Sequence, residues 1–243
     1  MGDVLNSFLK KREEAQQIYN RCSKQLLSSF TVAEKSVVRK EFSRGGECLH
    51  RGFYCPSPVL DIVIGGCKRG KLIKNPRKTP DFEYWFDADN KMILAKRPGI
   101  PEGCDNSVIE YELIYNYDGF TESVVFQINP DKTVQISGLT KCSYQNGLIQ
   151  SYDYMSIFDE PFNCNEISNE EFFYNNGKLI SSTLQDYNFD VKILRIDKFF
   201  YNYDADGKMI SYTSETWDDG KRIPSVWDDH CLLYTSDAAD DRI

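Results

Sequence analysis

The stretch Tyr174-Asn175-Asn176-Gly177-Lys178-Leu179-Ile180 decides how this chain folds. It joins an aromatic residue, Asn or Asp, Gly, a Lys and two apolar residues, and related phrases occur at four other places. The residues at the glycine position of the five copies are Asn90, Gly119, Gly147, Gly177 and Gly207. The successive intervals are therefore 29, 28, 30 and 30 residues. A nearly constant period of this length predicts a repeat architecture.

Each copy predicts a β-hairpin. Asn-Gly at 146–147 and 176–177 fits a type I′ turn, because both central residues need a positive φ, which Asn tolerates and Gly adopts freely. The copies at 87–90 and 204–207 carry one more residue, which suits a type I turn followed by a left-handed residue. The copy at 118–119 is degenerate and has lost its Lys.

Alternation on both sides of the turns predicts strands. In 82–86, for example, Phe82, Tyr84 and Phe86 point to one face, and Glu83 and Trp85 point to the other. We therefore expect a mainly β protein with an N-terminal helix: a long antiparallel β-meander of about ten or more strands. A further hairpin is expected before it, with strands at 60–64 and 71–74 around a turn at 65–70. The aromatic residues before the turns could stack across the sheet: Phe86, Tyr117, Tyr144, Tyr174 and Tyr203.

The first 30 residues predict an amphipathic helix with Asp3 as a cap or first-turn acid. Its apolar stripe should cover one face of the sheet: Leu5, Phe8, Leu9, Ala15, Ile18, Tyr19, Cys22 and Leu26. The capping-box pattern at 31–34 could start a second short helix, whereas 35–42 could equally be a first edge strand. The basic patch at 10–12 gives a membrane-surface role as a less favoured alternative.

Composition indicates a soluble globular chain. The 243 residues are 41% hydrophobic and 14% aromatic, enough for a substantial core. A formal net charge of −8 disfavours nucleic acid and suits a basic protein partner better. With no long apolar run and no secretory leader, we expect no membrane association and a location in the cytosol.

We divide the chain into three parts. Residues 1–45 form the helix and a connector that pack on the sheet, and residues 46–230 form the repetitive β-meander. The segment Cys231–Asp241 reads, in a single frame, as the translation of a transposase-type sequencing adapter. We therefore interpret residues 231–243 as a library artefact and exclude them from fold reasoning.

Excluding Cys231 leaves seven of the eight cysteines, without paired spacing, which favours reduced thiols. The only cluster contains Cys48, His50, Cys55 and Cys67. A tetrahedral zinc site is conceivable there, but no Cys-x-x-Cys knuckle is present. Cys48 and His50 as nucleophile and base is a second alternative. We favour the interpretation that these cysteines are small apolar residues in a loop and that residues 44–47 form a turn. We expect no catalytic residue, cofactor or metal ligand.

Two acidic patterns have alternative interpretations. Asp87, Asp89, Asp204 and Asp206 resemble the start of a calcium loop, but the third acid and the closing Glu are absent, so we expect Asp-stabilised turns. Five acids are expected on the loop between the third and fourth hairpins, where they could serve a paired-carboxylate hydrolase or form an acidic rim, which we favour: Asp159, Glu160, Glu166, Glu170 and Glu171.

The phrases at 174–180 and 203–210 resemble the tyrosine-aspartate repeats of bacterial Rhs-type proteins and the hairpin repeats of toxin-neutralising, immunity-like proteins. The resemblance covers roughly residues 82–217 and implies binding or encapsulation without catalytic residues. The units here are longer and less regular than those repeats.

The sequence therefore predicts a noncatalytic protein-binding module, of the immunity-like kind implied by this resemblance. The alternative is a carrier of a lipid or other apolar ligand in a curved half-barrel. A hydrolase ranks third.

Overall fold

The computed structural model describes residues 2–98, 109–158 and 162–224. Helices α1 (Gly2–Ser23) and α2 (Leu26–Ser36) lead into one 13-stranded antiparallel sheet. Between its first two strands lie the 3-10 helix η1 (Gly52–Tyr54) and the short helix α3 (Leu60–Val63). The strands are β1 (Arg39–Arg44), β2 (Lys71–Ile73), β3 (Phe82–Phe86), β4 (Met92–Pro98), β5 (Ile109–Asn116), β6 (Phe120–Ile128), β7 (Val134–Gln145), β8 (Leu148–Ile157), β9 (Cys164–Asn175), β10 (Lys178–Asn188), β11 (Ile193–Tyr203), β12 (Met209–Asp218) and β13 (Lys221–Ile223).

The sheet is the predicted meander, and it remains an open arc. Strands β3 to β13 follow one another in chain order, and β1 and β2 extend the β3 side. The five repeat copies form the turns β3–β4, β5–β6, β7–β8, β9–β10 and β11–β12, all at one end of the strands. Asn146-Gly147 and Asn176-Gly177 have φ values of 51°, 78°, 50° and 77°, and Asn90 and Gly207 are also left-handed. The predicted turn chemistry is confirmed.

A β-bulge accompanies every complete copy of the repeat. The register shifts by one residue at Ile93, Gln150, Ile180 and Ile210, each three residues after the glycine position. The degenerate copy at Gly119 pairs without a shift. Because a bulge bends its strand and increases the local twist, the repeat also supplies curvature at regular intervals.

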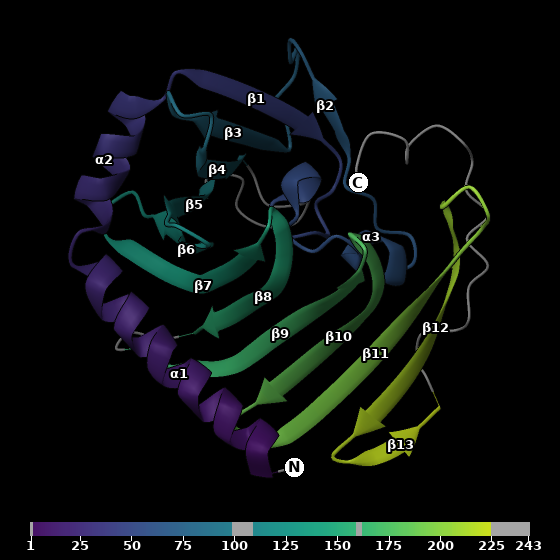
Figure 1. The fold of residues 1–243 in the computed structure, drawn as a ribbon. Helices are drawn as coiled ribbons and strands as arrows, with labels where there is room; N and C mark the ends of the chain where they lie inside the picture. The colour runs from purple at the N-terminus through teal and green to yellow at the C-terminus, as the bar shows by residue number, and fades with distance from the viewer. Residues whose placement is uncertain (1, 99–108, 159–161, 225–243) are drawn as a thin grey trace.

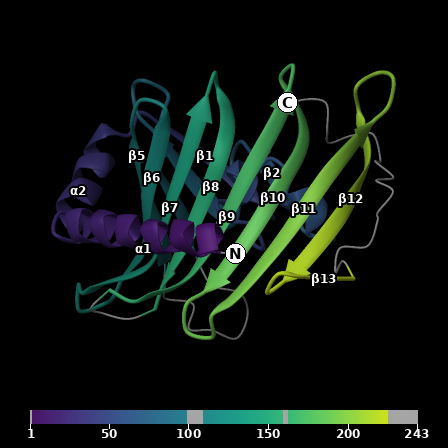
Figure 2. The same cartoon turned by 60° about the horizontal axis from the view of Figure 1, so that its bottom comes forward.

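Helices α1 and α2 cover the outer face of the arc (Figure 1), and α1 crosses several strands there (Figure 2). The register aligns nine apolar side chains across this face, all in one core cluster with the helices: Trp85, Leu94, Leu113, Val124, Leu139, Met155, Ile167, Tyr187 and Leu194. Phe8 of α1 meets Tyr187 with ring centroids 5.5 Å apart. The helix-on-sheet prediction is confirmed.

The helix stripe is narrower than predicted. Phe8, Ala15, Ile18 and Cys22 are buried, whereas Leu5 and Leu9 are 37% and 44% exposed. Leu26 is also buried but belongs to α2. A straight helix touches a curved face along a limited strip, which explains the exposed leucines.

The two readings of residues 31–42 each hold in part. Helix α2 begins at Leu26, before the predicted capping box, and Thr31 instead donates a hydrogen bond to the Leu27 carbonyl. The helix continues to Ser36, and β1 then starts at Arg39. Strand β1 is not at the edge, because it pairs with both β2 and β3.

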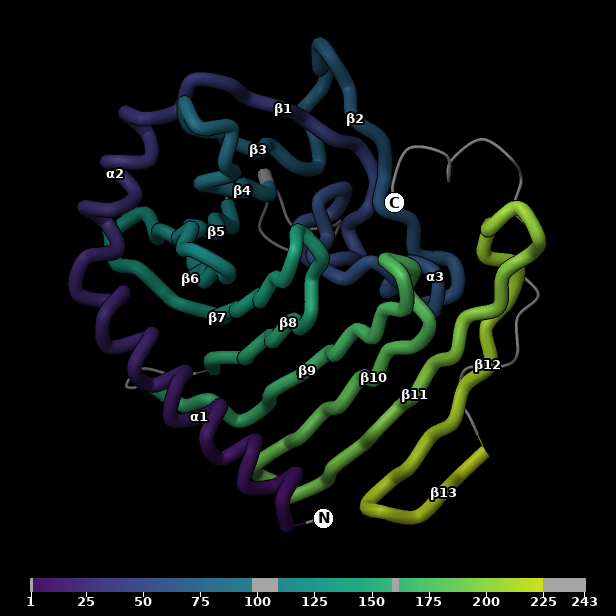
Figure 3. The backbone as a smooth tube through the Cα atoms, viewed as in Figure 1, coloured from purple at the N-terminus to yellow at the C-terminus, as the bar shows by residue number. Residues whose placement is uncertain are grey.

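The predicted hairpin at 60–74 is wrong. Residues 60–63 form α3, and β2 pairs with β1 instead. The Leu60 amide donates to the Ser57 hydroxyl at 3.0 Å, a helix-start contact. A short apolar run does not distinguish a strand from a buried helical turn. Residues 46–70, which we call the plug, lie inside the arc (Figure 3) and pack against inner-face residues such as Phe172 and Phe199 through Val59 and Val63.

The aromatic residues before the turns do not behave alike. Phe86 is buried against Tyr54, while Tyr117 stacks on Phe120 of its own hairpin with centroids 4.6 Å apart. Tyr203 donates a hydrogen bond to the Leu179 carbonyl of the neighbouring hairpin. Among the helices in the described ranges, none is long and apolar enough to cross a membrane.

Candidate functional site

A buried polar cluster joins the plug to the inner face; we call it the inner cluster: His50, Arg51, Glu112, Ser123, Thr140 and Tyr152. Arg51 donates from Nε and Nη2 to Glu112 Oε1, at 2.8 and 2.6 Å. His50 Nδ1 lies 2.6 Å from the Tyr152 hydroxyl. His50 Nε2 faces Glu112 Oε2 at 2.9 Å, although its alignment falls short of a hydrogen bond.

The protonation states of this cluster show how it attaches the plug to the sheet, and we call such an attachment an anchor. Burial opposes ionisation of Glu112, but Arg51 and His50 outweigh it and hold the pKa of the carboxyl well below its usual value. Burial also raises the pKa of Tyr152 well above its ordinary value, so its hydroxyl stays protonated. Arg51 has a φ of 60°, and its carbonyl accepts a hydrogen bond from Tyr84 at 2.8 Å. The cluster therefore fixes the plug to β5 and its neighbours.

A second carboxylate anchors the plug further along the sheet. The Ser57 hydroxyl donates to Glu170 at 2.7 Å, and burial raises the pKa of Glu170 to about 7. The predicted acidic rim is wrong for Glu170, which is only 6% exposed. Glu166, Glu170 and Glu171 lie in β9 and not in a loop, and Asp159 and Glu160 fall outside the described residues. The apolar residues of β9 lie on opposite faces, Ile167 in the outer core and Phe172 in the inner one, and acids separate them. The sequence of β9 therefore shows no simple alternation that would reveal a strand.

A cavity of about 240 Å³ lies between the start of the plug and strands β3, β4 and β5. Its lining includes Cys48, His50, Lys96, Arg97 and Glu110. Burial raises the pKa of Glu110, and Arg97 partly offsets that effect. A wall with this many charged groups does not suit an apolar ligand.

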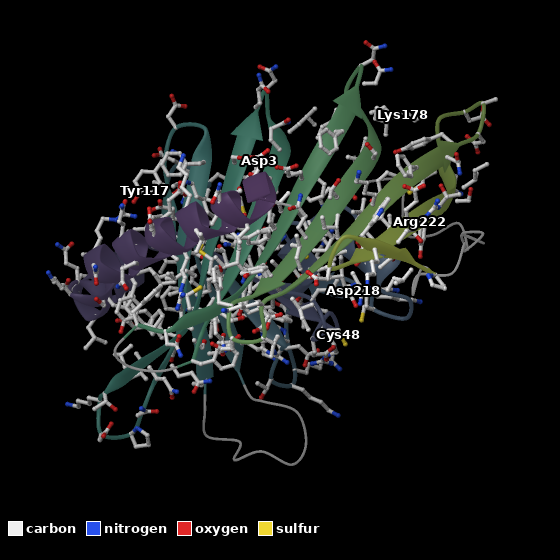
Figure 4. The ribbon with its side chains drawn as sticks, turned by 90° about the horizontal axis from the view of Figure 1, so that it is seen from below. Asp3, Cys48, Tyr117, Lys178, Asp218 and Arg222 are labelled. Carbon is white, nitrogen blue, oxygen red and sulfur yellow. The ribbon has the colours of Figure 1, made fainter. Side chains whose placement is uncertain are left out.

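The structure does not assemble the cysteine and histidine cluster considered as a zinc site. His50 turns toward Tyr152 and Glu112, and Cys55 is buried at 6% exposure. Cys48 and Cys67 lie at the surface of the plug, and Cys48 is apart from the hairpin turns that carry Tyr117 and Lys178 (Figure 4). In the described part of the chain, no three metal-binding side chains converge.

His50 and Cys48 do not form the nucleophile and base considered from the sequence either. Both ring nitrogens of His50 face inner-cluster partners, namely Tyr152 and Glu112. Neither partner lies near Cys48 in the sequence, so the pairing of His50 could not have been read from local spacing.

The acidic turns behave as predicted. Asp87 Oδ1 accepts hydrogen bonds from the amides of Asp89 and Lys91, at 3.0 and 2.9 Å. Asp204 Oδ1 accepts from Asp206 and Lys208 at 3.0 and 2.8 Å. These carboxylates therefore cap their own backbone turns.

An exposed apolar area lies on the outer face between α1 and the hairpin turns. We call it the turn-side patch: Phe173, Ile180, Phe200 and Ile210, which are 45%, 44%, 42% and 42% exposed. Phe173 and Phe200 both pair with Ser181 of β10, so the two rings flank a small side chain. Ile180 and Ile210 are two of the bulge residues.

A charged row separates the turn-side patch from the strip that α1 covers. It runs through Glu171, Thr183, Lys198 and Glu215 on adjacent strands. The nearest row toward α1 contains Asn169 and Ile196, and the next contains Ile167 and Leu194 of the core. The patch is therefore a separate apolar surface with a polar border, and it is not continuous with the core under α1.

Sequence reasoning named Ile180 and Ile210 as repeat residues but did not single out Phe173 or Phe200. Alternation in β9 and β11 places both on the outer face, and that signal was available. No signal in the sequence indicated how much of the sheet α1 covers.

In comparisons with protein-family models, with curated proteins and with solved structures, the chain matches nothing.

Proposed function

We propose that this protein is a noncatalytic binding module whose turn-side patch docks a basic partner protein. The observation that carries the proposal is the exposure of Phe173, Ile180, Phe200 and Ile210 together on one area of the outer face. Contiguous exposed apolar residues with a polar border are typical of protein interaction sites. Aromatic side chains supply much of the binding energy at such sites.

Charge supports a basic partner. The chain has a formal net charge of −8, and the row beside the patch places Glu171 and Glu215 around a single Lys198. Carboxylates at a rim accelerate the approach of a positively charged protein and oppose an acidic one. Binding should therefore weaken as the salt concentration rises.

A photo-crosslinking experiment tests the surface. A benzoyl-phenylalanine placed at position 173 or 200, in the cells that naturally make the chain, should capture the same single polypeptide. Val191 is 63% exposed and lies at the opposite end of the strands, so the same label there is the matched control. Capture of that polypeptide from 191 as well, or of a second copy of this chain, would refute the proposal.

Affinity provides the quantitative arm. With the captured protein purified, Phe200→Ser should weaken binding about 30-fold, the usual effect of losing a central aromatic anchor. Val191→Ser should leave the Kd unchanged. Equal affinities for Phe200→Ser and the unmodified chain would place the interface elsewhere.

We propose further that the partner is a toxin which this chain neutralises, on the basis of the resemblance at 174–180 and 203–210. Coexpression with the product of the adjacent reading frame is the direct test. Rescue of growth by the unmodified chain, and loss of rescue with Phe200→Ser, are the expected results. Failure of rescue while binding persists would refute neutralisation and leave the docking surface standing.

A further inference from the structure

The two ends of the plug come together in a narrow neck. Strand β1 pairs antiparallel with β2, so that Phe42 faces Ile73, Ser43 faces Leu72 and Arg44 faces Lys71. Continuing this register, one residue forward for one residue back, brings Gly45 beside Gly70 and Gly46 beside Arg69. Cys48 and Cys67 follow two residues beyond Gly46 and Arg69, one on each side of the neck.

Glycine packing confirms the approach of the two backbones. A methyl group on Gly45 would lie 3.2 Å from the Cα of Gly70. A methyl group on Gly46 would lie 2.5 Å from the Arg69 carbonyl oxygen. The two backbones therefore lie against each other at Gly45–Gly70 and at Gly46–Arg69.

Burial raises the pKa of the Cys67 thiol, and the neighbouring Cys48 thiol raises it further. Cys48 is exposed and Cys67 is partly exposed, whereas Cys22, Cys55, Cys142 and Cys164 are buried. A disulfide joins residues whose Cα atoms lie about 4.4 to 6.8 Å apart, and the close backbone approach at Gly45–Gly70 and Gly46–Arg69 favours such a separation two residues further on.

We propose that Cys48 and Cys67 form a reversible disulfide that closes the neck of the plug. The oxidant is a low-molecular-weight disulfide such as oxidised glutathione. The Cys48 thiolate attacks one glutathione sulfur and expels a glutathione thiolate, leaving a mixed disulfide. The Cys67 thiolate then attacks the Cys48 sulfur and expels the second glutathione. The two protons of the protein thiols end on the two glutathiones, and the protein has lost two electrons.

The bond locks the segment that carries both anchors of the inner face. Arg51 and Ser57 lie between Cys48 and Cys67, and they hold Glu112 and Glu170 respectively. Closing a loop of about 20 residues removes conformations from the unfolded chain and none from the folded one. The oxidised protein therefore keeps its plug seated under conditions that release it from the reduced protein.

The test uses the purified full chain, reduced and then incubated with oxidised glutathione at mildly alkaline pH. Peptide mapping without reductant should find Cys48 joined to Cys67, and thermal unfolding should shift up by about 6 to 12 °C. A thiol reductant should reverse both effects. Cys48→Ser should lose the link and the shift, with glutathione remaining on Cys67.

Cys164→Ser, which changes a buried thiol outside the plug, should form the link as the unmodified chain does. Separate glutathione adducts on Cys48 and Cys67 without a link would overturn the proposal. So would a shift that persists in Cys48→Ser. Because the turn-side patch lies on the outer face, neither result bears on partner docking there.

Discussion

The outer and inner faces of this sheet are covered by different physical means. On the outer face, nine apolar side chains in register meet the apolar stripe of α1 and residues of α2. On the inner face, the plug is held at two buried carboxylates, Glu112 and Glu170, as well as by apolar contacts. The same strands supply both faces through alternation.

The difference shows how specificity is divided between the faces. An apolar row tolerates many partners of suitable volume, because the hydrophobic effect has no direction. A buried carboxylate accepts only a partner that supplies its hydrogen bonds, because an unpaired buried charge is costly. The inner anchors therefore fix where the plug sits, while the outer row contributes burial.

Loss of the Arg51 guanidinium should give the largest effect. Arg51→Met removes two hydrogen bonds to Glu112 and leaves its carboxylate buried, which should lower the free energy of unfolding by about 3 to 5 kcal/mol. Denaturant unfolding measures this value. Arg39→Met is the matched control, because Arg39 is 39% exposed and should cost below about 1 kcal/mol.

The double variant Arg51→Met with Glu112→Gln sharpens the same comparison. Once the uncompensated charge is gone, much of the loss should be recovered, and the two single effects should not add. Additive losses would mean that Arg51 and Glu112 act separately, against the anchor described here.

The second prediction concerns the pH dependence that Glu170 gives the inner face. Its pKa of about 7 in the folded protein lies above the ordinary value of 4.5. Between these values the folded chain binds more protons than the unfolded chain, so stability is present at low pH and falls as pH rises. The total contribution is on the order of 3 kcal/mol.

Glu170→Gln should remove that loss. Relative to the unmodified chain, the variant should gain stability as pH rises from about 4.5 to 7 and stay level above it. Glu171→Gln changes the adjacent exposed acid on the outer face and should show no such trend. A Glu170→Gln difference that is independent of pH would mean that this carboxyl is not buried as described.

The smallest change in stability should come from substitutions in the turns, which belong to neither face of the sheet. Gly177 has a φ of 77° and open space around it, so Gly177→Ala adds only backbone strain, about 1 to 2 kcal/mol. Gly65 also has open space around it but does not have a positive φ. Gly65→Ala should therefore be neutral or slightly stabilising in thermal unfolding. Equal responses would contradict the left-handed turn.

Much of the fold was predictable because its signals are local. The glycine positions of the repeat fixed the turns, since positive φ depends on a residue and its immediate neighbours. Ten strands, β3 to β12, follow from those turns and their return loops. The helical period of residues 2–23 predicted α1, although not how narrow the buried stripe around Phe8 would be.

The plug and the functional surfaces could not be predicted in the same way. The residues around Leu60 favoured a strand, and Glu170 was assigned to an acidic rim. Their actual environment comes from Ser57 and its neighbours, which lie far from β9 in the sequence. Exposure of Phe200 depends on where α1 stops covering the sheet, and no local pattern encodes that.

The sequence alone thus determined where the backbone turns and which side chains share a face, because both follow from local dihedral preferences and the two-residue period of a strand. Only the tertiary structure decided that residues 46–70 fill the arc, that Arg51 meets Glu112, and that Cys48 neighbours Cys67. These contacts join residues far apart in the chain, and their energies depend on burial that exists only once the sheet has curved.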